Sequence, residues 1–451
     1  MSVAFGFIGK SLYISRRNNR KTMDNAFDFL TKERAFQVKE AVGTPVYVYD
    51  ETGLRRAAEE VLHFPHAFGY RARYAMKANS NAYILRLFND LGIHFDASSG
   101  YEAERALLAG IEGKKIQITA QEYPANLKDL IQQGVLFNAS SCRQLERYGR
   151  DFPGSTVSIR INPGIGSGHN NRTNVGGLSS SFGIWHEWIP DVRVIAKKYG
   201  LKIIKLHTHI GSGSDPKTWQ RVVDMSLKAV REFPDVKTLN LGGGFKVART
   251  PAEKTTDLQI IGQPVKKAFE IFYTETGRKL DLEIEPGTYL VAASGILLAQ
   301  VIDKISTGKE GYTFLKLDTG MNDLTRTTLY GSLHPVKIYP TGKMKQGKKE
   351  KVVIVGHCCE SGDIFTPVPG DPEGIQPLEL PEAHVGDLLA FGVAGAYCAS
   401  MSLTNYNSFP QIPEVLITSD GNMKLLRERQ TVRNMVSLEC DKELSVESGE
   451  S

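Results

Sequence analysis

Short apolar runs that end in polar or glycine residues alternate with helical patterns across the first two thirds of the chain. The helical patterns include Tyr83–Leu91, Tyr101–Ala109, Pro124–Gln133 and Trp219–Glu232. The eight apolar runs are Tyr74–Asn79, His94–Ser99, Ile116–Thr119, Leu136–Ser140, Val157–Pro163, Ile204–Ser212, Leu239–Gly244 and Leu282–Thr288. Eight strands that alternate with helices predict an α/β fold, a closed parallel (β/α)8 barrel of the TIM type rather than an open sheet.

The ends of these predicted strands hold many of the reactive side chains. In such barrels the loops after the strands converge on one mouth, where the chemistry takes place. The strand ends carry Lys77, Asp96, Arg160, His209, the triple glycine Gly242–Gly244, and Glu285. This inventory predicts an enzyme.

A chain of 451 residues is too long for one compact domain. After Glu285 come strand-like segments with few helical patterns: Ile296–Ile305, Tyr312–Leu317, Leu333–Ile338, Lys351–Val355, Asp387–Phe391 and Glu414–Thr418. We therefore expect a C-terminal all-β domain, a sandwich or barrel. The predicted division is a tail over 1–22, a helix and a strand over 23–50 that join the edge of the β domain, the barrel over 51–295, and the β domain over 296–451.

The charge distribution argues against nucleic acid as a partner. Of 55 basic residues, five lie in residues 1–22, which contain no acidic residue, and the other 50 balance 50 acidic residues. The body of the chain is therefore neutral and shows no electrostatic footprint for nucleic acid. No apolar run approaches the roughly 20 residues of a membrane span. Five cysteines without paired spacing fit a reducing compartment, so we expect a cytoplasmic protein, with 1–22 as a disordered or organelle-targeting tail.

Two strand ends admit more than one interpretation. Lys77 in an apolar run suits a Schiff-base lysine, although a salt-bridged or snorkelling lysine fits equally well. His207 and His209 point to the same side of their strand, a pattern that also occurs in metal sites. A metal would need further ligands, and only Asp96 and Glu285 are available at neighbouring ends. The small-residue turn after His209 favours phosphate instead, and no metal is expected.

A bound cofactor would explain the remaining strand ends. Gly242–Gly244 ends the strand after the one that carries Ser212, and phosphate sites in barrels often use adjacent loops near the last strands. A buried Glu285 needs a cation, and a protonated pyridine nitrogen is such a cation. Together with Lys77, these groups describe a pyridoxal phosphate site.

Three segments of the C-terminal region add candidate groups. Gly356–Asp363 gathers thiols and acids, and Gly392–Tyr397 is a glycine-rich turn that ends in a tyrosine. Arg326 with Tyr330 suits a carboxylate. Each segment alone could be structural, since buried cysteines are commonly inert and Tyr397 could be a core residue.

With these motifs the chain resembles the fold-type III pyridoxal phosphate decarboxylases, and among them the diaminopimelate decarboxylases. The matching stretches run in the family's order across roughly residues 40–420. They are Tyr74–Asn79, His209–Gly213, Gly242–Gly244, Glu285-Pro286-Gly287, Met321–Tyr330 with His334-Pro335, Cys359-Glu360-Ser361 with Asp363, and Gly395-Ala396-Tyr397.

The resemblance implies how the cofactor, pyridoxal 5′-phosphate, is held. Lys77 forms the Schiff base, His209 stacks on the cofactor ring, and Glu285 pairs with the pyridinium nitrogen. The other implied cofactor contacts, most of them to the phosphate, are Ser212, Gly243, Gly244, Gly287 and Tyr397.

The resemblance also implies how the substrate is bound. Cys359 is the proton donor and is delivered from a partner subunit, so an obligate homodimer with sites at its interface is implied. Glu360 contacts the far amino group of the substrate. The full set of implied substrate contacts is Thr288, Arg326, Tyr330, Glu360 and Tyr397.

One position departs from the family pattern. The family usually has arginine after Glu-Pro-Gly, where this chain has Thr288. Threonine donates a hydrogen bond but cannot supply a bidentate charged clamp. Either another basic residue compensates, or the substrate differs.

The function that the resemblance implies is decarboxylation of meso-2,6-diaminopimelate to L-lysine and CO2, a carboxy-lyase reaction of lysine biosynthesis. Three alternatives stay open: a decarboxylase of another basic or D-amino acid such as D-ornithine or D-lysine, a non-catalytic regulator with a decarboxylase fold, and, less favoured, a racemase of the same fold type.

Overall fold

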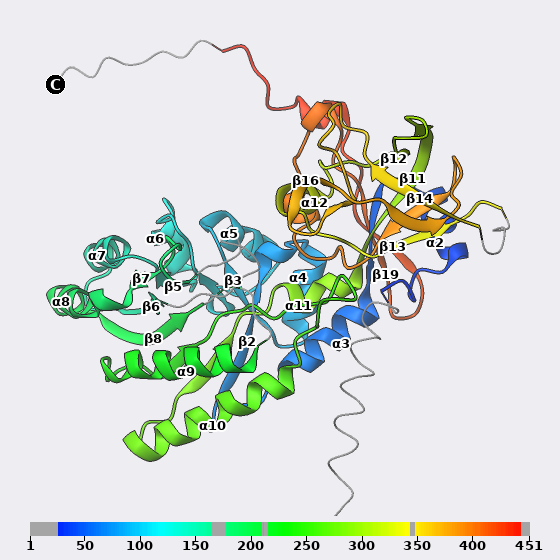
Figure 1. Cartoon of the computed structure of the whole chain (residues 1–451). Coiled ribbons are helices and arrows are strands. Elements are labelled where there is room, and N and C mark those ends of the chain that lie inside the picture. The colour runs from blue at the N-terminus through cyan, green and yellow to red at the C-terminus, as the bar shows by residue number, and fades with distance from the viewer. Residues whose placement is uncertain (1–25, 165–175, 210, 212–214, 343–347, 443–451) are drawn as a thin grey trace, which may run out of the picture.

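Eight parallel strands close into a barrel in the computed structural model, which describes residues 26–164, 176–209, 211, 215–342 and 348–442 (Figure 1). Pairing of β10 with β2 and of β5 with β6 completes the ring. The barrel strands are β2 (Tyr70–Ala75), β3 (His94–Ala97), β4 (Ile116–Ile118), β5 (Leu136–Ala139), β6 (Thr156–Asn162), β8 (Lys202–Thr208), β9 (Thr238–Asn240) and β10 (Asp281–Ile284). The predicted barrel is confirmed, and each predicted run overlaps one of these strands.

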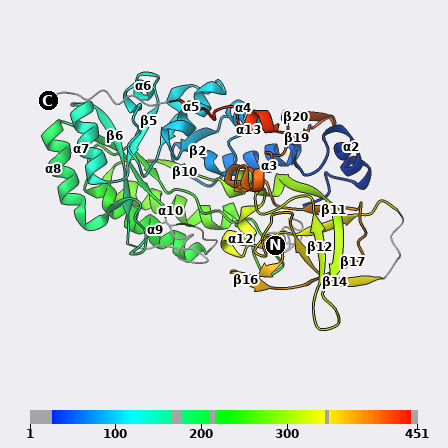
Figure 2. The same ribbon diagram turned by 90° about the horizontal axis from the view of Figure 1, so that it is seen from above.

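Helices surround the barrel, with α7 and α8 at one end and α9 and α10 along one side (Figures 1 and 2). They are α3 (Glu51–Leu62), α4 (Ala82–Asp90), α5 (Gly100–Leu108), α6 (Leu127–Gln132), α7 (Cys142–Asp151), α8 (Ile189–Tyr199), α9 (Pro216–Arg231) and α10 (Leu258–Thr276). A two-residue strand, β7 (Ile184–Trp185), extends the sheet beside β6. The helical patterns predicted from the sequence correspond to α4, α5, α6 and α9.

Two strand-to-helix turns use the same capping device. Before α5, the Ser99 hydroxyl accepts from Glu102 N at 3.1 Å, and the Glu102 carboxylate accepts from Ser98 N at 2.7 Å. Before α7, Ser141 and Gln144 make the equivalent bonds. These reciprocal bonds satisfy backbone donors that a helix start leaves unpaired, so each helix begins at a fixed point above its strand.

The first strand differs from its prediction in one respect. The run Tyr74–Asn79 was expected to be a strand with Lys77 within it, but β2 ends at Ala75 and Lys77 lies in the short 3-10 helix η1 (Met76–Ala78). The Tyr74 hydroxyl donates to the carbonyl of Asn79 at 2.8 Å across this turn. The ring of Tyr74 also packs edge-on against Phe88 at 4.9 Å, so the turn that carries Lys77 is held at both ends.

The second domain is mostly β-sheet, as predicted. Its main sheet has the order β17-β14-β12-β11-β1-β19-β20, with β18 paired to β11 and β13. Its strands are β1 (Val46–Asp50), β11 (Gly295–Ser306), β12 (Thr313–Leu317), β13 (Val336–Tyr339), β14 (Lys349–Val355), β17 (Leu378–Pro381), β18 (Leu388–Phe391), β19 (Glu414–Ile417) and β20 (Met423–Arg427), with a hairpin of β15 (Pro367–Val368) and β16 (Asp371–Ile375). The expectation that residues 44–50 lie at the edge of this domain is wrong: β1 pairs with both β11 and β19 in the interior of the sheet.

Short helices complete the second domain and its junction with the barrel. α2 (Lys32–Val42) precedes β1, and α11 (Thr288–Val291) follows β10, where the chain leaves the barrel. α12 (Thr325–Tyr330) and α13 (Val432–Met435) lie within the second domain. Among the described residues no helix is both long and apolar enough to cross a bilayer, and all five cysteines are free thiols. The predicted tail over residues 1–22 lies outside the described residues.

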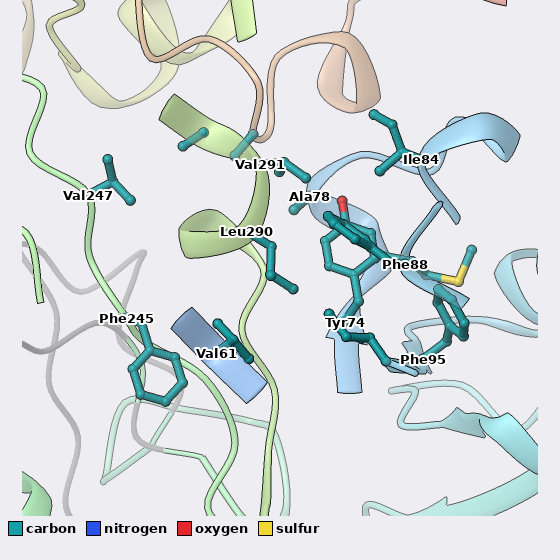
Figure 3. Close-up of a cluster of buried hydrophobic side chains, with 14 of the residues drawn as sticks. Val61, Tyr74, Ala78, Ile84, Phe88, Phe95, Phe245, Val247, Leu290 and Val291 are labelled. Atoms are coloured by element: carbon teal, nitrogen blue, oxygen red, sulfur yellow. The ribbon is translucent and has the colours of Figure 1, made fainter. Parts of the chain in front are cut away.

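An apolar cluster supports the turn that carries Lys77 (Figure 3). Tyr74 and Ala78 contribute from the strand and turn, and Phe88 from α4. Leu290 and Val291 of α11 belong to the same cluster, as do Phe245 and Val247 from the segment after β9. Close-packed side chains of this kind resist movement, so this cluster holds the loop after β9, the Lys77 turn and α11 together.

The interior of the barrel is polar and charged. Glu283 on β10 is fully buried, and its carboxylate accepts hydrogen bonds from Arg73 Nε at 2.9 Å, Lys205 Nζ at 2.6 Å and Arg71 Nη1 at 2.8 Å. Lys205 also donates to Gln117 at 2.8 Å. Burial would raise the pKa of Glu283, but Arg73 and Lys205 lower it well below its usual value. This ionic layer lies beneath the strand ends that carry the candidate site.

We expect Glu283→Gln to destabilise the fold by about 3–5 kcal/mol at pH 7, because Arg73 and Lys205 would remain buried without a counter-charge. Urea unfolding followed by circular dichroism measures the loss. Since the pKa of Glu283 is depressed by folding, its contribution is present above the unfolded value of about 4.3 and is lost as the pH falls through the folded value. The difference between wild type and variant should therefore shrink in acid.

Glu146→Gln is the matched control, because Glu146 pairs with Lys198 at 3.0 Å on the surface. It should leave the urea midpoint almost unchanged. A Glu283→Gln variant as stable as this control would show that the ionic layer does not stabilise the barrel.

Candidate active site

The turn that carries Lys77 opens into a cavity of about 370 Å³. This volume lies in the range of small-molecule sites. Lys77 is half-buried at its wall. The other lining residues are Ser80, Tyr101, Glu102, Arg105, Tyr397, Ser400 and Met401. Residues of the barrel and of the second domain therefore share one cavity around a lysine amine.

A loop of the second domain is tied directly to the Lys77 turn. Tyr397 N donates to Ala78 O at 2.8 Å, and the Ser400 hydroxyl donates to Lys77 O at 2.8 Å. Tyr397 has a φ of 56°, a left-handed conformation that non-glycine residues seldom adopt. Such strain persists only where surrounding contacts determine it, and it concentrates at functional sites. The geometry thus places the Tyr397 ring at the mouth of the barrel.

The pKa values of two buried carboxyl groups in the barrel mouth are shifted in opposite directions. Burial raises the pKa of Asp96 well above its usual value, and repulsion from Glu285 raises it further. Burial would also raise the pKa of Glu285, but His207, His209 and Arg160 together lower it below its usual value. Glu285 accepts from His207 Nε2 at 3.1 Å and from Asn240 Nδ2 at 2.6 Å. These shifts favour the ionised form of Glu285 and the protonated form of Asp96.

The two histidines of this strand end, His207 and His209, both influence the charge of Glu285. His207 is buried and contacts Glu285, and its ring centroid lies 6.5 Å from that of His209. Burial, with Arg160 and Lys77 nearby, lowers the pKa of His209 well below its usual value, so its ring is neutral. Within the described ranges no three His, Cys, Asp or Glu side chains are arranged to hold a metal ion.

At two positions of the triple-glycine turn, close contacts leave no room for a side chain. A Cβ on Gly242, whose φ is +69°, would lie 2.7 Å from the His209 ring. A Cβ on Gly243 would lie 2.3 Å from the carbonyl oxygen of Glu285. The amide of Gly243 donates to His209 Nδ1 at 3.1 Å, which fixes the orientation of that ring. The third glycine, Gly244, has a φ of +108° and makes no hydrogen bond through its amide to the described residues.

These residues fit pyridoxal phosphate. The mouth of the barrel around Lys77 offers a lysine amine, a neutral flat imidazole, an ionised carboxylate and a glycine turn with a backbone amide that has no acceptor among the described residues. Those groups match the aldehyde, the ring, the ring nitrogen and the phosphate of that cofactor. Gly287 lies beside this set, since a Cβ on it would approach the Tyr397 hydroxyl to 3.2 Å. The predicted contact Ser212 lies outside the described residues.

The predicted proton donor lies on a different loop. Cys359 is exposed, and its amide donates to Asn407 at 2.8 Å, while the Glu360 carboxylate accepts from the Tyr406 hydroxyl. Burial and Asp363 raise the pKa of the adjacent thiol, Cys358, to about 12. Neither Cys359 nor Glu360 is among the described residues that line the Lys77 cavity, and of the two neighbouring thiols Cys359 is the accessible one.

The predicted carboxylate-binding residues lie on α12. The Arg326 guanidinium carbon lies 5.5 Å from the centre of the Tyr330 ring and 5.8 Å from that of Tyr397. Both Arg326 and Tyr330 are half-buried. Thr288 is the first residue of α11 and is half-buried as well. The structure thus places Arg326 and Tyr330 beside Tyr397, which lines the Lys77 cavity.

Some residues of the site were not anticipated from the sequence. The ionic layer of Arg73, Lys205 and Glu283 was missed. The available signal was a spacing of two residues, which separates Glu283 from Glu285 and also separates Lys205, His207 and His209. That period of two is the pattern of side chains that share one face. Arg249, in the loop after β9, was missed because an isolated arginine in an irregular segment follows no pattern.

Comparison with known proteins is consistent with this geometry. Residues 54–292 match the family model of the pyridoxal-binding domain of pyridoxal-dependent decarboxylases. Over 407 residues the chain is 39% identical to a diaminopimelate decarboxylase from Streptomyces coelicolor, and the match covers 88% of this chain and 90% of that protein.

Solved structures agree in fold. A crystal structure of a diaminopimelate decarboxylase matches with a TM-score of 0.85 at 35% identity, covering 91% of this chain and 97% of the other. The Helicobacter pylori diaminopimelate decarboxylase in complex with L-lysine matches with a TM-score of 0.76 at 28% identity, covering 89% and 98%. The similarity therefore extends over both domains.

We expect Gly243→Ala to lower the affinity for pyridoxal phosphate roughly 10- to 100-fold, because the new methyl group overpacks against the Glu285 backbone and displaces the glycine turn. An absorbance titration with the cofactor measures the change. Gly342→Ala is the control, since a Cβ there meets nothing within 4 Å. Unchanged cofactor affinity in Gly243→Ala would contradict the role of this turn.

Proposed function

The chain belongs to the pyridoxal-dependent decarboxylases, and we propose that it removes CO2 from meso-2,6-diaminopimelate to give L-lysine. The family membership rests on the match over residues 54–292 and on relatives up to 39% identical over most of the chain. The observation that carries the reaction is the ionised Glu285 in the same barrel mouth as the Lys77 amine, since both groups act electrostatically on Asp96 and His209.

Each group in the mouth of the barrel has a distinct task in this proposal. Bound pyridoxal phosphate supplies an electron sink for the electron pair that CO2 leaves behind. Lys77 would hold the cofactor covalently, and the neutral ring of His209 would contact its ring. Glu285 would keep a proton on the ring nitrogen, because its negative charge stabilises that protonated form. Gly244 and Tyr397 would bind the phosphate, and Gly243 orients His209.

The charge on Glu285 is maintained by its neighbours. His207 and Asn240 donate to its two carboxylate oxygens, while Asp96 is held in the protonated form. One negative charge therefore faces the cofactor instead of two that repel each other. This division of charge between Glu285 and Asp96 supports a Glu285 carboxylate that stays ionised even though it is buried.

A second copy of the chain completes the site in this proposal. Cys359 donates the proton to the carbon that has lost CO2, and Glu360 binds the far amino group, both from the partner subunit of a homodimer. Cys359 is exposed, whereas the neighbouring Cys358 is buried with a raised pKa, which supports Cys359 as the donor. A cytoplasmic location stays a prediction.

The direct test is CO2 release from meso-diaminopimelate by purified protein with added pyridoxal phosphate. We expect release by wild type and a loss of more than a thousandfold in Lys77→Ala, because the covalent attachment of the cofactor is gone. L-Lysine is quantified as the second product. Absence of CO2 release by a wild-type protein that binds the cofactor through Lys77 would overturn the proposed substrate, and D-ornithine and D-lysine would be tested next.

The same assay addresses the shared site. Cys359→Ala alone should be nearly inactive, and so should Lys77→Ala alone. When the two variants are co-expressed at equal levels and pair at random, half of the dimers are mixed. One of the two sites in each mixed dimer has both native residues, so about one quarter of wild-type activity should return. No recovery in verified mixed dimers would contradict delivery of Cys359 from the partner subunit.

A further inference from the structure

Arg249 presents buried hydrogen-bond donors that the chain itself does not satisfy. Its Nε and Nη2 atoms are buried and have no hydrogen-bond partner among the described residues. Buried donors of a charged group are costly to leave unpaired. An arginine held in this way is suited to a ligand that supplies the missing acceptors.

The backbone of Arg249 is firmly placed. Its amide and that of Thr250 both donate to the Glu253 carboxylate, at 2.6 Å and 3.1 Å. Phe245 and Val247, just before it, are buried in the apolar cluster that also contains Leu290 of α11 (Figure 3). The segment that leads from Gly242–Gly244 to Arg249 is therefore fixed by apolar packing before Arg249 and by backbone hydrogen bonds at Arg249 itself.

A second cation with an unsatisfied donor lies nearby. Arg326 Nε is also buried without a partner among the described residues. Burial, together with repulsion from Arg326, lowers the pKa of Arg249 to about 10. Both arginines add to the lowering of the His334 pKa by burial, and both oppose the rise that burial causes in the pKa of Cys398. The two guanidinium groups therefore act on one small region beside the Tyr397 ring.

An oxyanion would supply the hydrogen-bond acceptors that Arg249 and Arg326 lack. Two neighbouring guanidinium groups repel each other, and a group with two negatively charged oxygens between them removes the repulsion and fills their donor positions. The retained carboxylate of an amino-acid substrate has this chemistry, and so has the cofactor phosphate. Arg326 lies over the ring of Tyr330 on α12, and that helix belongs to the second domain rather than to the barrel loop that carries the glycine turn, which favours the carboxylate.

We propose that Arg249, together with Arg326, binds the carboxylate that the substrate keeps after CO2 is lost. Thr288, at the start of α11, offers a hydroxyl but no charge, and Arg249 supplies the second cation from the neighbouring loop. This inference rests on the proposed function, since it assigns a carboxylate-bearing substrate and product to the Lys77 cavity. It makes Arg249 a substrate-binding residue and a determinant of specificity.

The experiment compares two ligands of the pyridoxal-phosphate-loaded protein that differ by one carboxylate. L-Lysine has the retained carboxylate, and 1,5-diaminopentane lacks it. Arg249→Leu should weaken L-lysine binding about 10- to 100-fold, the range for a charge-assisted hydrogen bond. Binding of 1,5-diaminopentane should change less than twofold. Isothermal titration measures both affinities, and KM for diaminopimelate should rise much more than kcat falls.

Lys254→Leu is the matched control, because it removes one positive charge from an exposed position of the same loop. It should leave both affinities unchanged. Arg249→Lys should recover part of the L-lysine affinity, since a point charge replaces a two-pronged donor. If the leucine variant does not fold, Arg249→Gln removes the charge with less change in polarity and carries the same test.

Each result separates the possibilities. Equal L-lysine binding by wild type and Arg249→Leu would overturn the inference while leaving the proposed function intact. A loss of pyridoxal phosphate affinity with unchanged L-lysine affinity would overturn it in favour of the phosphate. A wild-type protein that neither binds L-lysine nor releases CO2 would instead contradict the proposed function.

Discussion

The structure depends on how negative charge is distributed inside a polar barrel. Glu283 is held by Arg73 and Lys205 in a buried ionic layer, and Glu285 lies two residues further along the same strand. Glu285 accepts hydrogen bonds from His207 and Asn240, and the nearby cation Arg160 also lowers its pKa. Burial and repulsion from Glu285 raise the pKa of Asp96 well above its usual value, which disfavours a second negative charge beside Glu285.

The second domain contributes residues to the Lys77 cavity. Its β1 strand comes from the N-terminal side of the barrel sequence and lies inside the sheet between β11 and β19, so the two domains are interleaved along the chain. The loop with Tyr397 then bonds to the Lys77 turn, and α12 brings Arg326 to the same cavity. In the proposed function each domain contributes to both ligands, because Tyr397 of the second domain joins the phosphate site and Arg249 of the barrel joins the carboxylate site.

Much of the fold and part of the site could be predicted from the sequence. Alternating strands and helices reveal a barrel because its contacts follow chain order, and Lys77, His209 and Glu285 were expected at the mouth because side chains at strand ends converge there. The interior position of β1 could not be predicted, since pairing between residues 46–50 and 414–417 leaves no local pattern. Lys77 was placed in a strand because the turn at Met76–Ala78 is closed by the Tyr74 hydroxyl, a contact without a motif. Arg249 was missed for the same reason: its importance lies in unpaired donors, which only three-dimensional packing shows.

The central claim is that Glu285 remains ionised and keeps the ring nitrogen of bound pyridoxal phosphate protonated. The most direct measurement is the 15N chemical shift of that nitrogen, with 15N-labelled cofactor in wild type and in Glu285→Gln at neutral pH. We predict a protonated nitrogen in wild type and an unprotonated one in the variant, with Asp96 unable to compensate because it is already protonated. An unprotonated nitrogen in wild type, or the same shift in both proteins, would contradict the division of charge on which the proposed chemistry rests.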